Sequence, residues 1–116
     1  MGFGEEAEAY INFIFHRIAD WQNAGANKAL PPMFSIDGVA DLPETELDHL
    51  AGYGNTRPVR IGNAAFHTQL DIYGELMDSI YLYNKRGKPI TYDQWLSIRA
   101  ILGYVCSIWR NADMSI

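Results

Sequence analysis

Polar side chains that can hold a sugar are concentrated in one short stretch of this 116-residue chain. The stretch consists of Arg57-Pro-Val-Arg-Ile-Gly-Asn-Ala-Ala65 and, shortly after it, Gln69-Leu-Asp-Ile-Tyr-Gly-Glu75. Guanidinium and carboxamide groups form planar, multi-point hydrogen bonds that match vicinal hydroxyls. For Arg60 and Asn63, a sugar ligand and a self-satisfied polar network that supports the loop are equally good interpretations, because burying such groups unpaired is costly. The candidate ligands are Arg57, Arg60, Asn63 and Gln69.

Three carboxylates follow at helical spacing, at Asp71, Glu75 and Asp78. Their positions lie along one stripe of a helix, and paired carboxylates can act as acid and base in glycoside hydrolysis. The favoured interpretation is that they pair with Arg57 or Arg60 and hold the preceding loop, or that they face water. Carboxylates on adjacent helical turns are also too close for the wide pair that an inverting hydrolase needs.

Other chemistry has weaker support in the sequence. Tyr53 lies between two glycines, where its ring can stack on a pyranose face or cover the core. The three histidines show no metal-ligand spacing, and the isolated glycines lack the Lys-Ser/Thr of a phosphate loop. Gly52 and Gly54 are better explained as turn residues. We therefore expect no metal site and no cofactor.

Hydrophobic periodicity predicts three helices that must position these groups. The first covers residues 5–22 and ends at Asn23-Ala-Gly25. The second begins at Asn63 as N-cap, runs to residue 84, and is apolar over enough of its circumference to pack on more than one side. The third begins at the capping box Thr91-Tyr-Asp-Gln94 and runs to residue 111. Its predicted interior stripe is Trp95, Ile98, Leu102, Val105 and Trp109.

The connections between these helices differ in length. The short loop of residues 85–90 predicts an antiparallel hairpin of the second and third helices. Residues 25–62 form a long irregular connection, with a short extended piece expected within 30–38 and one or two helical turns within 43–50. The sequence therefore predicts an all-α fold of antiparallel helical hairpins, with the long loops gathered at one end of a toroid.

Composition limits the partners and the surroundings. A net charge of −5 and a pI near 5.0 argue against nucleic acid and anionic membranes as partners. The basic cluster Lys85-Arg86-Gly87-Lys88 is explained by the attraction of cations to the negative dipole end of a helix. Cys106 lies in an apolar helical pattern and is interpreted as an inert core thiol. Acids stand where a signal peptide would carry positive charge, and no apolar run approaches the ~20 residues of a membrane span. We expect a cytoplasmic chain.

Four motifs occur in order along the chain. They are Phe34-Ser-Ile-Asp-Gly38, Glu46-Leu-Asp-His-Leu-Ala-Gly-Tyr53, Arg57-Pro-Val-Arg-Ile-Gly-Asn-Ala-Ala65 and Gln69-Leu-Asp-Ile-Tyr-Gly-Glu75. Together they resemble the family-15 glycoside hydrolases, which include glucoamylase, glucodextranase and trehalase-like enzymes built on an (α/α)6 barrel, and the Pro-Val-Arg-Ile-Gly-Asn block is the most specific part. The resemblance implies that residues 1–116 are one segment of such a barrel and that the chemistry is inverting hydrolysis of α-glucosidic bonds by two glutamates.

The same resemblance implies that both catalytic glutamates lie outside this chain. The general acid belongs to an Ile-Trp-Glu sequence that follows the helix matching residues 91–111, and the general base belongs to a later segment. We therefore assign no catalytic residue and expect the chain alone to be inactive. The substrate-binding residues implied by the motifs are Arg60, Asn63, Gln69 and Asp71, with Tyr53 on the leaving-sugar side. Asp37 matches the Asp-Gly of an earlier motif, and a structural role for it is at least as well supported as sugar binding.

Two alternatives belong to other functional classes. One is a non-catalytic scaffold, similar to the glucoamylase-like domains of phosphorylase kinase subunits, and the other is a helical interaction domain. The intact Arg-Ile-Gly-Asn block favours the hydrolase, with α-linked glucosides, either oligosaccharides or trehalose, as substrates. A barrel arc also leaves apolar edges, so we expect the chain to form a homo-oligomer through them.

Overall fold

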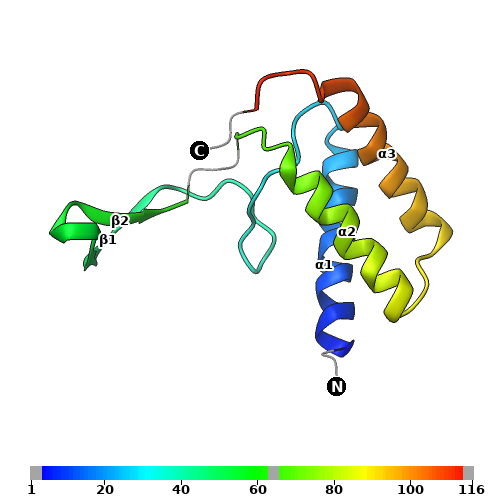
Figure 1. Cartoon of the computed structure of the whole chain (residues 1–116), viewed down its shortest axis with the longest axis horizontal. Coiled ribbons are helices and arrows are strands. Elements are labelled where there is room, and N and C mark those ends of the chain that lie inside the picture. The colour runs from blue at the N-terminus through cyan, green and yellow to red at the C-terminus, as the bar shows by residue number, and fades with distance from the viewer. Residues whose placement is uncertain (1–3, 63–65, 114–116) are drawn as a thin grey trace. The chain divides into compact units, whose positions relative to one another are not determined.

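A computed structural model describes residues 4–62 and 66–113 of the chain. Two compact units make up the chain: a helical unit of residues 1–30 and 68–116, and a hairpin unit of residues 31–67. The antiparallel sheet of the hairpin unit shows that the expectation of an all-α fold was wrong. The elements in order are α1 (Gly4–Asn23), β1 (Thr45–Ala51), the 3-10 helix η1 (Tyr53–Asn55), β2 (Pro58–Ile61), α2 (Asp71–Arg86) and α3 (Tyr92–Ile108) (Figure 1).

The core of the helical unit is built from all three helices. Ile11 of α1, Ile80 of α2 and Ile98 of α3 are buried together in one cluster. Ile18 of α1 and Ile101 of α3 are fully buried as well. Burying each of these side chains contributes about 1.5–3 kcal/mol. Trp21, Leu30 and Tyr73 are buried in the same unit and add to its core.

The prediction for α1 is confirmed, because the helix ends at Asn23 as the Asn23-Ala-Gly25 signal indicates. Gly25 has a φ of +98°, a conformation that glycine adopts without a steric penalty. The N–H of Ala26 then donates to the carbonyl oxygen of Trp21 at 3.1 Å. This closing pattern satisfies a carbonyl that the helix end would otherwise leave open.

The start of α2 differs from the prediction. The helix begins at Asp71 and not at Asn63, which lies outside the described residues. Leu70 occupies the N-cap position and offers no side-chain cap. Its N–H instead donates to Oδ2 of Asp113 at 2.9 Å. The first turn of α2 is therefore stabilised by a carboxylate distant in sequence, which the local pattern could not reveal.

The start of α3 is confirmed in detail. The N–H of Gln94 donates to Oγ1 of Thr91 at 3.2 Å, and the N–H of Thr91 donates to Oε1 of Gln94 at 2.8 Å. Both halves of the capping box are thus formed. The helix ends at Ile108, three residues before the predicted end at residue 111. As predicted, α2 and α3 run in opposite directions on either side of a short loop (Figure 1).

The predicted interior stripe of α3 was wrong in part. Ile98 is buried as predicted, whereas Trp95, Leu102 and Trp109 are 43%, 40% and 56% exposed. Ile101, which lies beside the predicted stripe, is buried as well, so the helix packs through a part of its wide apolar arc that only overlaps the stripe. Cys106 lies on the outer side and is exposed, so the prediction of a core thiol was also wrong.

The exposed apolar face of α3, formed by Trp95, Leu102 and Trp109, gives a testable expectation. Contiguous apolar surface on soluble proteins commonly marks a contact region. We expect the purified chain to self-associate at micromolar concentration, most simply as a two-fold dimer, in multi-angle light scattering. Replacing Leu102 and Trp109 together by Gln should shift the distribution towards monomer. A wild-type chain that stays monomeric over this range would contradict the expectation.

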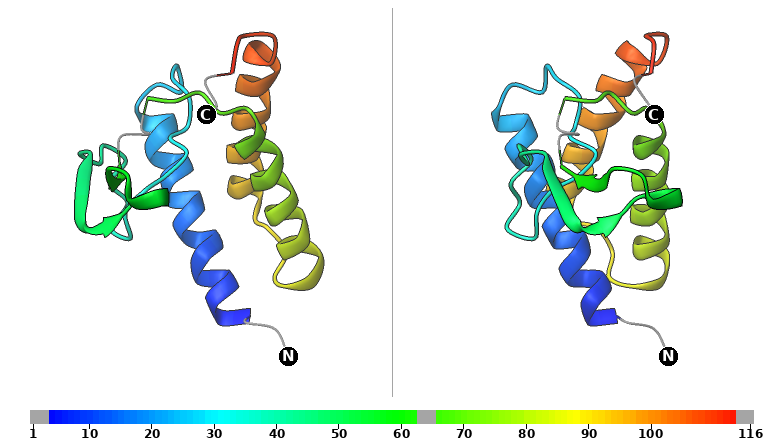
Figure 2. Two further views of the ribbon diagram at one scale, coloured as in Figure 1. Left: turned by 60° about the vertical axis from the view of Figure 1, so that its left-hand side comes forward. Right: turned by 90° about the vertical axis from the view of Figure 1, so that its left-hand side faces the viewer.

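The hairpin unit pairs β1 with β2 in an antiparallel ladder, which the two views of Figure 2 show. Glu46 lies opposite Arg60 and Leu47 lies opposite Val59, and an irregularity after Leu47 brings Ala51 opposite Pro58. The helical turns expected within residues 43–50 are therefore a strand, and that prediction was wrong. A strand depends on its partner for hydrogen bonds, so the local sequence does not decide between a helical turn and a strand.

Residues 35–39 form a tight turn and not the extended piece that the sequence predicts. The N–H of Ser35 donates to the carbonyl oxygen of Val39 at 2.9 Å, and the N–H of Gly38 donates to the carbonyl oxygen of Ser35 at 2.9 Å. Asp37 is exposed on this turn.

Among the described residues, none of the helices combines the length and the apolar character needed to cross a bilayer.

Candidate substrate-binding site

Arg60 lies on β2, and two carboxylates hold its guanidinium group. Its Nη1 is 2.7 Å from Oε1 of Glu44, and its Nη2 is 2.5 Å from Oε1 of Glu46. The hydrogen bond and the charge of Glu46, and then the charge of Glu44, raise the pKa of Arg60 above its usual value. These partners are not the helix carboxylates that the sequence suggested. A guanidinium has five N–H donors, so two ion pairs leave donors available to a ligand.

The local fold explains why these groups meet. Glu44 and Glu46 are two residues apart, and alternate residues of an extended strand point to the same side. Glu46 lies directly opposite Arg60 in the ladder, where opposite charges on one face attract. The Glu-x-Glu spacing was the available signal for this cluster. It was missed because the segment was expected to be helical.

Gly62 ends the Arg60-Ile-Gly part of the motif and has a structural reason to be glycine. Its φ is +97°, and a Cβ built there would lie 2.5 Å from the carbonyl oxygen of Pro43. Any side chain would therefore push the end of β2 away from the segment that leads into β1. Because the glycine permits this close approach, it keeps Arg60 beside its two carboxylates.

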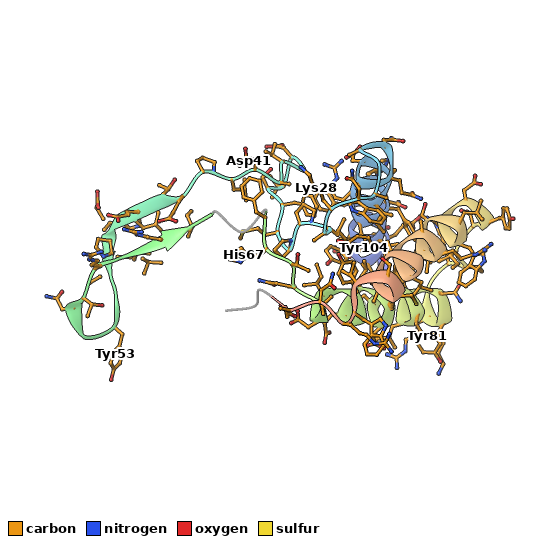
Figure 3. The ribbon with its side chains drawn as sticks, turned by 90° about the horizontal axis from the view of Figure 1, so that it is seen from above. Lys28, Asp41, Tyr53, His67, Tyr81 and Tyr104 are labelled. Atoms are coloured by element: carbon orange, nitrogen blue, oxygen red, sulfur yellow. The ribbon has the colours of Figure 1, made fainter. Side chains whose placement is uncertain are left out.

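Tyr53 lies at the closed end of the hairpin, and its ring is 99% exposed. Figure 3 shows the ring projecting away from the ribbon. The backbone around it is fixed, because Thr56 Oγ1 donates to the carbonyl oxygen of Tyr53 at 2.8 Å and Gly54 has a φ of +63°. The prediction that the glycines serve a turn is confirmed. A ring so exposed does not cover a core, which leaves stacking on a sugar as the remaining hypothesis.

Gln69 and Asp71 flank the N-terminal end of α2. Gln69 is half-buried, whereas Asp71 is exposed and its Oδ1 accepts the N–H of Ile72 at 3.0 Å. The positive end of the helix dipole lies here and favours oxygen acceptors. Glu75 and Asp78 are also exposed, consistent with the interpretation that these carboxylates face water.

The predicted site residues belong to different parts of the chain. Tyr53 and Arg60 lie in the hairpin unit, Gln69 and Asp71 lie in the helical unit, and Asn63 lies outside the described residues. A pocket shared by all five residues therefore stays a prediction. In the part of the chain that the structure describes, no group of three or more histidine, cysteine or acidic residues is arranged to hold a metal ion.

Two surface hollows, of about 540 and 400 Å³, lie beside the start of α1 and the end of α2. Neither is lined by a predicted sugar ligand. Lys88 borders the first, where its Nζ is 2.7 Å from Oε1 of Glu8, and this partner raises the pKa of Lys88. Lys85 and Arg86 occupy the last turn of α2, which confirms the prediction that the basic cluster lies at a helix end.

The sequence profile described as glycosyl hydrolases family 15 matches residues 1–116. The chain belongs to this family. Trehalases of Mycolicibacterium smegmatis and Mycobacterium tuberculosis are each 35% identical to it, over 117 and 119 residues. Trehalase 1 of Sulfolobus acidocaldarius is 37% identical over 115 residues and covers 97% of the chain. No solved structure gives a significant match.

The family-15 match confirms the resemblance drawn from the sequence motifs. Both mycobacterial alignments cover 100% of this chain but 17% of the relatives' own length. The Sulfolobus alignment covers 20% of that enzyme. The chain therefore spans about a fifth of the length of these relatives, and the similarity includes both the hairpin unit and the helical unit.

The sequence did not reveal one contact beside these candidate residues. Asp113 follows α3 and lies in no helix or strand, and no spacing rule connects it with Leu70. The sequence also did not reveal the aromatic contacts near Leu30, in the segment after α1. There the N–H of Leu30 donates to the Tyr73 hydroxyl at 2.9 Å, and the Tyr104 ring lies 6.0 Å from that of Tyr73. Burial raises the pKa of Tyr73, although the bond from Leu30 acts in the opposite direction.

Proposed function

We propose that this chain is a segment of an inverting, trehalase-like α-glucoside hydrolase and carries part of its substrate-binding surface. The supporting observation is the similarity to trehalases along the entire chain, which includes the stretch of residues 57–75. The family membership supplies the reaction class, hydrolysis of a glycosidic bond. Trehalose, in which two glucose units are joined through their anomeric carbons, is the proposed substrate.

The substrate-binding roles follow from the chemistry of each side chain. Arg60 would donate its remaining N–H groups to vicinal hydroxyls while Glu44 and Glu46 hold the guanidinium plane. The exposed Tyr53 ring would stack on a sugar face. Gln69 and Asp71 would bind hydroxyls beside the start of α2, and Asn63 would add a carboxamide. The two glutamates that act as acid and base would come from the rest of the protein.

The proposed mechanism determines which anomers are released. In an inverting hydrolase the base takes a proton from water as that water attacks C1, and the acid protonates the bridging oxygen as the C1–O bond breaks. Attack from the opposite face converts the α-linked glucose into β-glucose. The leaving glucose keeps its configuration and departs as α-glucose. Each trehalose therefore gives one molecule of each anomer.

The test is proton NMR of the full-length protein acting on trehalose, recorded before the free anomers interconvert. We expect the two anomeric signals of glucose to grow at equal initial rates. Growth of the α signal alone would show retention and would contradict the inverting mechanism. Turnover of maltose or another α-glucoside without turnover of trehalose would contradict the proposed substrate.

A further inference from the structure

We propose that Asp113 is a positioning residue of this site: its carboxylate fixes where α2 begins and thereby holds Gln69 and Asp71 in place for the sugar. The inference rests on the proposed function, since the value of this placement depends on a sugar being bound there. It adds a residue that none of the sequence motifs contains.

The contact itself is well defined. Oδ2 of Asp113 accepts the N–H of Leu70 at 2.9 Å, although the two residues are 43 positions apart. Leu70 is the N-cap of α2 and provides no side-chain acceptor of its own. The first N–H groups of a helix have no partner within the helix, and a carboxylate is the acceptor that the positive dipole end favours. Asp113 thus does from a distance what an N-cap side chain usually does.

The position of Leu70 makes this contact relevant to the site. Leu70 stands between Gln69 and Asp71, so its backbone conformation sets the direction in which both neighbours leave the chain. The Asp71 carboxylate is restrained further, because its Oδ1 accepts the N–H of Ile72 at 3.0 Å. Loss of the Asp113 contact would leave the Leu70 N–H to water and let the first turn fray. Both candidate ligands would then lose their fixed directions.

The backbone turn at the end of α3 places Asp113 near Leu70. The helix closes with the N–H of Trp109 donating to the carbonyl oxygen of Val105 at 2.9 Å. The N–H of Asn111 then donates to the carbonyl oxygen of Ile108 at 2.8 Å, so the chain turns directly after the helix. The turn brings residue 113 to the start of α2, and both elements belong to the helical unit. A charge-assisted hydrogen bond in this way links the segment after α3 to the proposed substrate-binding stretch.

The experiment compares Asp113→Ala and Asp113→Asn in the full-length protein, with steady-state kinetics on trehalose. We expect Asp113→Ala to raise KM by about 10-fold with little change in kcat, because Gln69 and Asp71 bind the ground state and the transition state alike. Asp113→Asn keeps an oxygen acceptor in the same place and should stay close to wild type. Asp93→Ala, which removes an exposed aspartate from the first turn of α3, is the matched control and should leave both constants unchanged.

A second measurement separates failure of this inference from failure of the proposed function. Hydrogen exchange at the Leu70 amide should be faster in Asp113→Ala than in wild type or Asp93→Ala. Unchanged exchange, or faster exchange with unchanged KM in an active enzyme, would overturn the positioning role. If the wild-type protein turned over no α-glucoside, the proposed function would fail, and faster exchange alone would still support Asp113 as the residue that fixes the start of α2.

Discussion

The 116-residue chain, purified alone, should release no glucose from trehalose, maltose or starch. A general acid or base contributes about 10²- to 10⁴-fold to such a reaction, and both glutamates are expected in other segments of the protein. The full-length protein should release glucose under the same conditions. A coupled glucose assay on both samples at equal molar concentration measures the difference, which should amount to several orders of magnitude.

The carboxylates of α2 provide the control for this prediction. Asp71 and Glu75 are exposed on adjacent turns, and four residues advance a helix by only about 6 Å. An inverting pair needs a separation of roughly 6.5–9.5 Å between its carboxyl groups, with a water between them. Turnover by the isolated chain that disappears in Asp71→Asn or Glu75→Gln would therefore show these residues to be catalytic and the assignment to be wrong.

The parts of the fold that the sequence predicted correctly depend on local signals. The end of α1 was found from Asn23-Ala-Gly25, and the start of α3 from the capping box of Thr91 and Gln94. In each case the residues that form the decisive hydrogen bonds are a few positions apart. Short-range geometry is contained in short-range sequence, and for this reason these boundaries were predictable.

The parts that were missed depend on partners distant in sequence. β1 pairs with β2, and the N–H of Leu70 at the start of α2 donates to Asp113. Neither partner is visible in a window of a few residues. A segment that is a moderate helix former on its own can become a strand when tertiary contacts favour pairing.

The face of α3 was misassigned in part, for a different reason. Its apolar residues cover a wide arc, and periodicity shows that such an arc exists without showing which part of it meets the neighbouring helices. The predicted stripe included Ile98, which is buried, but it also placed both tryptophans inside and left out the buried Ile101. Large aromatic side chains are often only partly buried even in a complete core, so they are poor guides to orientation.

For the site, the sequence identified the right kind of residue but not its partners. Arg60 was expected either to bind sugar or to pair with the helix carboxylates, and it pairs with Glu44 and Glu46 of its own unit. Cross-strand neighbours can be deduced only when the register is known. The roles of Tyr53, Gln69 and Asp71 as sugar ligands stay predictions, as does that of Asn63.

Substituting Ile101→Ala should destabilise the helical unit more than any surface change. Ile101 is 0% exposed on α3, in the same core as the fully buried Ile18 of α1. Removing three carbon atoms from such a position loses their transfer free energy and leaves a cavity, at a typical cost of about 2–5 kcal/mol. Urea unfolding of the chain, followed by circular dichroism at fixed protein concentration, should show a lower midpoint with an unchanged slope.

Ile36→Ala is the matched control for this substitution, because it removes the same atoms from a side chain that is 94% exposed on the turn of residues 35–39. Its effect should lie within about 0.5 kcal/mol of zero, as for other surface substitutions. Equal effects of the two variants would contradict a core in which Ile101 is enclosed. Both variants lose the same hydrocarbon, so a larger effect of Ile101→Ala reflects its burial. The higher helix propensity of Ala acts in the opposite direction at position 101 and cannot produce this contrast.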